Sequence, residues 1–138
     1  MKRGFCPVTD RFFRNIFKNR DGKVLPYVSG IEVEGETAIV HFRGEINANT
    51  IPIIKNNCCK KTKLDRNILI DFKEVTHIDS ATLAFLVEII KKLREKNRKM
   101  AVLNVSDRQQ RLMEITKLDG LIDSYDDEGA ALSFLNSA

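Results

Sequence analysis

The chain has 138 residues, 43% of them hydrophobic and 30% charged, which suits one folded domain with a short extension. No apolar run approaches the ~18 residues that a membrane-spanning helix needs. The first residues also lack the continuous apolar stretch and small-residue cleavage site of a signal peptide. We therefore expect a cytoplasmic protein without a transmembrane segment.

The net charge of +4 is concentrated at the N-terminus. Residues 1–23 hold seven basic and two acidic side chains, whereas the other 16 basic and 17 acidic residues nearly cancel. A nearly neutral body argues against nucleic-acid binding. The three cysteines (Cys6, Cys58 and Cys59) have no CxxC spacing, which favours reduced thiols. Without a glycine-rich phosphate loop or a metal-ligand cluster, we expect no cofactor and no metal.

Residues 9–19 predict a short amphipathic helix with basic side chains away from its apolar stripe, which comprises Phe12, Phe13, Ile16 and Phe17. The stripe would pack on the domain or on a second copy, so monomer and dimer both remain open. The alternative is weak contact with a membrane surface or with a partner. We divide the chain into a basic amphipathic extension, residues 1–23, and a domain, residues 24–138.

Three strands are expected next, and a turn joins the last two. Residues 23–28 predict an edge strand, because Pro26 suits only an edge. Residues 31–34 and 37–42 predict a hairpin that turns at Gly35.

A helix follows the hairpin. Asn47 or Asn49 would cap it, and it would end near Lys60. Residues 67–72 then form an almost continuous apolar run, which is typical of a central strand buried on both faces.

The junction of that strand with the next helix carries the side chains of most interest. Asp79 and Ser80 come just before an amphipathic run that predicts a helix to about Asn97. A serine at such a position is most often a simple N-cap.

The rest of the domain continues the alternation of strands and helices. We expect a strand at residues 99–105 and a helix from Ser106 or Asp107 to about Lys117. A short strand at 122–125 and a helix at 127–135, capped by Asp126, would follow. This order predicts an α/β fold, a small mixed sheet with about four helices packed against it.

No catalytic constellation emerges from the sequence. His77 is close to Asp79 and Ser80, but side chains two or three residues apart at a strand–helix junction do not converge, and no GxSxG frame surrounds Ser80. We therefore predict that the chain is not an enzyme. We interpret His77 as a loop or packing residue, and Asp71 as a structural side chain that pairs with a cation or caps a turn.

The run DFKEVTHIDSATLAFLVEII, followed by KMAVLNVSDRQQRLMEITKLDGLIDSYDDEGAAL, resembles a STAS domain of the anti-sigma factor antagonist family. The resemblance covers about residues 31–135. That family places a phosphorylatable serine directly after an aspartate at the N-terminus of its second helix, and the matching pair here is Asp79 and Ser80. The resemblance therefore implies a STAS-like fold and a protein-binding switch.

In such a switch, the unmodified chain binds an anti-sigma factor with serine kinase activity, and phosphorylation of Ser80 ends the binding. A phosphate adds about −1.5 to −2 charges. The helix N-terminus tolerates this charge in the free domain, whereas a close-packed interface beside Asp79 does not. The expected interface comprises Asp79, Ser80, Ala81 and Thr82.

The sequence departs from the family pattern at Thr82, where the family usually has a glycine. We expect the bulk of Thr82 to hinder partner approach, and Thr82 is an alternative phosphate acceptor. Two alternative functions remain open. One is an accessory subunit that regulates a membrane transporter or a lipid-transport complex, and the other is a stressosome-like scaffold.

Overall fold

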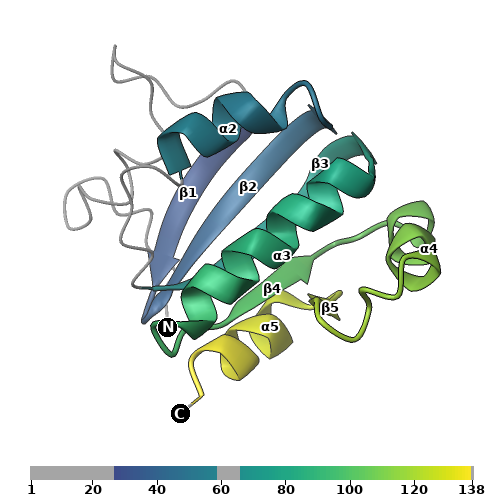
Figure 1. The fold of residues 1–138 in the computed structure, drawn as a ribbon. Helices are drawn as coiled ribbons and strands as arrows, with labels where there is room; N and C mark the ends of the chain where they lie inside the picture. Colours follow the sequence, from purple (N-terminus) through teal and green to yellow (C-terminus); the bar gives the residue numbers. More distant parts are fainter. Residues whose placement is uncertain (1–26, 59–65, 138) are drawn as a thin grey trace.

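The computed structural model describes residues 27–58 and 66–137, and in these ranges it contains one five-stranded sheet in the order β1-β2-β3-β4-β5 (Figure 1). The first two strands, β1 (Val28–Glu34) and β2 (Thr37–Ile46), form an antiparallel hairpin. The following strands are parallel to β2: β3 (Asn67–Ile78), β4 (Met100–Leu103) and β5 (Asp123–Tyr125). The prediction of a small mixed sheet is confirmed.

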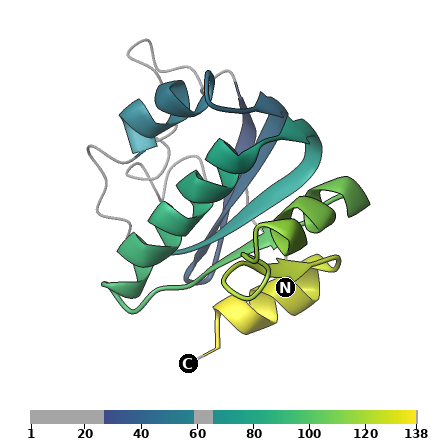
Figure 2. The same cartoon turned by 45° about the vertical axis from the view of Figure 1, so that its right-hand side comes forward.

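Helices cover both faces of this sheet. On one face, α2 (Ile51–Cys58), α3 (Ser80–Arg94) and α4 (Asp107–Ile115) share a large apolar core with the strands. Figures 1 and 2 show α2 and α3 crossing this face. On the other face, α5 (Glu128–Leu135) packs on a smaller core.

The strand sequences explain the two cores. Along β2, Val40 and Phe42 face α3, whereas Ile39 belongs to the core under α5. Along β3, Ile70 belongs to the core under α3 and Leu69 to the core under α5. Because successive side chains of a strand point to opposite faces, a strand covered on both faces needs an unbroken apolar run.

Three strands are longer than predicted. The strand β1 already begins at Val28, where the separate edge strand at 23–28 was predicted to end, rather than at residue 31. The hairpin turns at Gly35 (φ +63°) as expected, but β2 continues through Gly44 (φ +78°) to Ile46. The extension gives β3 a partner as far as Ile78, so the predicted end at residue 72 is wrong. The apolar run stops earlier because the end of β3 is less covered. His77 is therefore an exposed residue of a strand, not of a loop.

Several other boundaries move by a few residues. The helix α3 ends at Arg94 rather than Asn97, and α4 ends at Ile115 rather than Lys117. The strand β4 is shorter than predicted because Asn104 adopts φ +60°.

The cap of the last helix is also corrected. The side chain of Asp127, not that of Asp126, accepts the N–H of Ala130 at 2.9 Å and begins α5.

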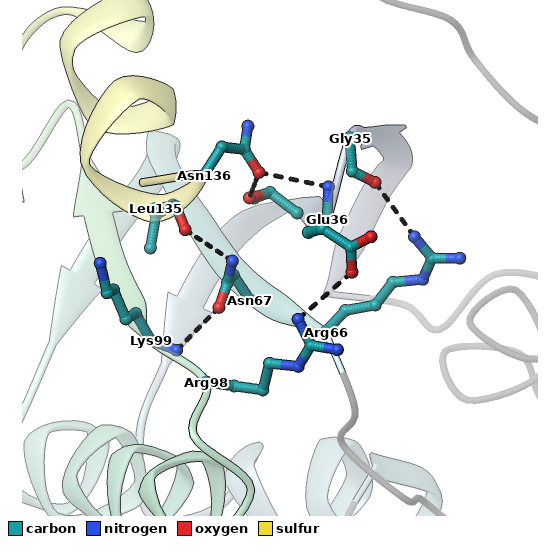
Figure 3. Close-up of polar contacts among 9 residues, drawn as sticks. Gly35, Glu36, Arg66, Asn67, Arg98, Lys99, Leu135 and Asn136 are labelled. Atoms are coloured by element: carbon teal, nitrogen blue, oxygen red, sulfur yellow. Dashed lines mark hydrogen bonds and ion pairs between the residues drawn. The ribbon is translucent and has the colours of Figure 1, made fainter. Parts of the chain in front are cut away.

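The C-terminal end of α5 is held by two asparagines (Figure 3). The buried amide of Asn67 donates to the carbonyl of Leu135 (2.6 Å) and accepts the N–H of Lys99 (2.9 Å). The side-chain oxygen of Asn136 accepts the Glu36 N–H (3.2 Å) and the Thr37 hydroxyl (2.9 Å). The last helix is therefore tied to the hairpin and to the starts of β3 and β4.

The predicted helix at 9–19, the basic extension, most of the predicted edge strand at 23–28, Cys6, Cys59 and the predicted helix end at Lys60 lie outside the described residues. Within the described part of the chain, no helix has both the length and the apolarity to cross a membrane.

Candidate functional site

Ser80 is the first residue of α3, directly after the end of β3. The cap is Asp79, whose carboxylate accepts the Thr82 N–H at 3.0 Å, so the interpretation of Ser80 as the N-cap is wrong. Ser80 is exposed, and its hydroxyl forms no hydrogen bond with any residue that the structure describes. The hydroxyl is therefore open to solvent beside a fixed carboxylate.

Thr82 points into the protein. Thr82 is 0% exposed, and its hydroxyl donates to the carbonyl of Ile46 at 2.6 Å. The hydroxyl also closes a capping box, because it accepts the N–H of Asp79 at 3.4 Å. The extra bulk of Thr82 thus fills space under the end of β2 and does not project from the surface beside Ser80.

Asp79 also connects α3 to the segment between β2 and α2. Its second carboxylate oxygen accepts the N–H of Ala48 at 3.2 Å. Asn47 shapes this segment, because its side-chain oxygen accepts the N–H groups of Asn49 (2.8 Å) and Thr50 (3.1 Å). The sequence predicts Asn47 as a cap before α2, but it gives no sign that residues 47–50 lie next to Ser80.

A groove of about 790 Å³ lies between α2 and α3, beside Ser80. Ala81, Ala84 and Phe85 of α3 line one side, and Ile51 and Pro52 of α2 line the other. Further along α2, Ile53 is 44% exposed. No local pattern in the sequence indicates this apolar surface, because the residues on α2 and those on α3 are about 30 positions apart.

In the isolated domain, two opposing charges lie beside Ser80, the positive end of the α3 dipole and the carboxylate of Asp79. The first turn of α3 contains no acidic residue, while Lys91, Lys92 and Arg94 lie in its last turn. The positive end of the helix dipole is thus offset mainly by Asp79, which precedes the helix.

A separate polar network lies on the α5 side of the sheet. The ring nitrogens of His41 contact the carboxylates of Asp71 (2.7 Å) and Glu32 (2.5 Å). Burial raises the pKa of Asp71, but hydrogen bonds from Asn104, the Lys73 N–H and His41 outweigh it and hold this pKa below its usual value. Asp71 thus has the structural pairing role that its position suggested.

A family model described as the STAS domain matches residues 30–131. The chain belongs to the STAS domain family. The resemblance inferred from the Asp79–Ser80 junction and its surrounding elements is confirmed.

Relatives of this STAS domain include an anti-sigma-B factor antagonist of Listeria monocytogenes, which is 36% identical over 91 residues, or 65% of this chain and 80% of the relative. A putative anti-sigma factor antagonist of Thermotoga maritima has a similar fold, with a TM-score of 0.70 and 19% identity over 78% of this chain and 93% of its own. The Bacillus cell fate determinant SpoIIAA, solved in its phosphorylated form, has a TM-score of 0.57 at 17% identity, over 75% of this chain and 96% of its own.

The part of this STAS domain that the structure describes contains no group of three or more histidine, cysteine, aspartate or glutamate side chains arranged to hold a metal ion. In the network around His41, the two carboxylates contact different ring nitrogens.

Proposed function

We propose that this STAS domain is an anti-sigma factor antagonist that works as a phosphorylation-controlled binding switch. Unmodified, it binds an anti-sigma factor through the surface around Ser80. The partner's serine kinase activity phosphorylates Ser80, and the complex dissociates. The observation that carries this proposal is the exposed Ser80 hydroxyl, without a hydrogen-bond partner among the described residues, beside a fixed Asp79 and an apolar groove.

Ser80 fits the role of phosphate acceptor better than Thr82. A kinase must reach the hydroxyl, and that of Thr82 is buried and donates to the Ile46 carbonyl. Phosphorylation of Thr82 would require the N-terminus of α3 to separate from β2. The Ser80 hydroxyl is available without any such rearrangement.

The residues around Ser80 have two kinds of role in the proposed interface, contact with the partner and positioning of the helix. Ser80 and Ala81 contact the partner, with Pro52 and Ala84 on the two sides of the groove. Asp79 and Thr82 act as positioning residues, because their hydrogen bonds hold the N-terminus of α3 against the end of β2 and against Ala48. The switch operates by binding, and the chain itself catalyses no reaction.

Phosphorylation has opposite consequences in the free domain and in the complex. In the free domain, the new charge faces solvent and the positive end of α3. In the complex, the phosphate loses water, and the carboxylate of Asp79 beside it repels it. A modification that leaves the fold intact therefore abolishes binding.

The relatives support the proposal in two ways. The Listeria monocytogenes relative is named an anti-sigma-B factor antagonist, and the chain covers most of its length. SpoIIAA, which shares the fold, has been solved in a phosphorylated form. Because sigma factors act where transcription takes place, the proposal implies a cytoplasmic protein.

The direct test is calorimetric titration of the chain with anti-sigma factors encoded in the same genome. We expect Ser80→Asp to fold normally and to bind at least about 100-fold more weakly than wild type, since like charges in an interface cost several kcal/mol. Ser80→Ala should keep most of the affinity.

The matched control is Ser133→Asp, which places the same charge on an exposed position of α5. It should bind like wild type. Equal affinities of Ser80→Asp and wild type for the anti-sigma factor would refute the switch.

A further inference from the structure

The strand β3 extends well beyond its neighbour β4. The two strands pair from Ile68 with Met100 to Asp71 with Leu103, and there β4 ends. Asn104 (φ +60°) turns the chain out of the sheet, and its side chain donates to the Asp71 carboxylate at 3.0 Å. On its other side, β3 continues to pair with β2 as far as Ile78. The end of β3 is therefore paired on one side only, within the part of the chain that the structure describes.

The unpaired edge covers residues 74–78. The Lys73 N–H is already bonded to the Asp71 carboxylate at 2.9 Å, so the free backbone groups begin after it. No described residue hydrogen-bonds to the edge at residues 74–78 from the β4 side. Five residues of strand span about 16 Å. Such an edge can accept another strand, and proteins usually cover or blunt it.

A cleft of about 300 Å³ separates this edge from α4. Thr76, His77 and Ile78 line the strand side, and the helix side begins at Ser106. Gln109 and Ser106 are locked in a capping box, so this wall is preorganised. Figure 1 shows the chain running on from the end of β4 to α4, and Figure 2 shows α4 on the side of the molecule where β3 curves.

One face of α4 gives the cleft its chemistry. Arg108, Arg111, Leu112 and Ile115 follow helical spacing and all line the cleft. Ile115 is 71% exposed, and neither arginine forms an ion pair with a described residue. The lining contains two arginines and one histidine but no carboxylate. A ligand that matches this wall carries an acidic group near the arginines and an aliphatic group near Ile115.

We propose that this cleft binds an extended acidic segment of a protein partner, which adds a strand to the free edge of β3 in line with β4. Backbone hydrogen bonds to residues 74–78 hold the segment against β3, and the side chains of the segment that contact α4 determine its specificity. Because residues i and i+2 of a strand lie on one face, the segment carries an acidic residue two positions from an aliphatic one. This site is separate from the groove between α2 and α3.

The test uses synthetic heptapeptides in which an aspartate and an isoleucine are two positions apart among threonines, made in both orders. Amide chemical shifts of the labelled full chain follow the titration. We expect the shifts to concentrate at residues 74–78 and along α4. Replacing both Arg108 and Arg111 by glutamate should weaken binding about tenfold or more. Arg94→Glu, on an exposed position of α3, is the matched control and should have no effect.

A second control separates strand addition from simple charge attraction. The same peptide with alternate amides N-methylated keeps its charge but loses backbone donors, so it should not bind. Equal binding by the methylated peptide, or no shifts at residues 74–78 at millimolar peptide, would overturn the proposal. A dimer in sedimentation that protects these same amides would also overturn it, because a second copy would then be the occupant.

Discussion

At the scale of single residues, three neighbours at the start of α3 have distinct roles. Asp79 caps the helix and binds the N–H of Ala48, Thr82 anchors it to β2, and Ser80 alone offers an exposed hydroxyl. The place of the Asp-Ser pair between a buried strand and an amphipathic helix could be predicted from the sequence, whereas the phosphorylation of Ser80 was implied only by the resemblance to the STAS family. The inward direction of Thr82 could not be predicted, because it depends on the carbonyl of Ile46, 36 residues away.

Replacing Thr82 by valine tests this anchoring role. The change keeps the shape but leaves the buried carbonyl of Ile46 without its donor, so we expect a loss of about 1–3 kcal/mol in the free energy of unfolding. Urea denaturation measures the loss. The exposed Thr76→Val is the control, with an expected change within about 0.5 kcal/mol. A Thr82→Val variant as stable as wild type would show that the hydrogen bond is dispensable.

At the scale of elements, the interiors of strands and helices followed from the sequence, and several ends did not. The apolar run at residues 67–72 correctly predicts a central strand. Its continuation to Ile78 depends on the length of β2, which the local pattern of β3 does not contain. The same extension creates both the position of Ser80 and the open edge beside α4. The His41 network was also missed, because it joins β1, β2 and β3 across the sheet.

Because of Asp71 in this network, we expect the free energy of unfolding to depend on pH in the acidic range. The pKa of Asp71 is lower in the folded chain than the ~3.9 of an unfolded aspartate, so the folded state favours the charged form. The stabilisation is fully present above about pH 4 and is lost as pH falls through the folded pKa.

We therefore expect Asp71→Asn to be less stable at neutral pH but to lose less further stability between about pH 4 and pH 2. Urea denaturation at a series of pH values measures both effects, with the exposed Asp119→Asn as control. Acid profiles that run parallel for wild type and Asp71→Asn would contradict this role.

At the scale of the whole molecule, parallel strands bring segments that are distant in sequence together at the carboxyl ends of the strands. The ends of β2, β3 and β4 lead to residues 47–50, Ser80 and Ser106 respectively. In open α/β sheets, binding sites form at the carboxyl ends of the strands. The fold class and order of elements could be predicted because strands and helices alternate along the chain. The groove and the cleft could not, because each is bounded by elements that are separate in sequence.

We propose that a phosphate on Ser80 ends binding without unfolding the domain. The most direct measurement is calorimetric titration of one anti-sigma factor with the unmodified chain and with the chain fully phosphorylated at Ser80. We predict tight binding of the unmodified chain, at least about 100-fold weaker binding of the phosphorylated chain, and a retained fold by circular dichroism. Equal affinity of the two forms would contradict the account.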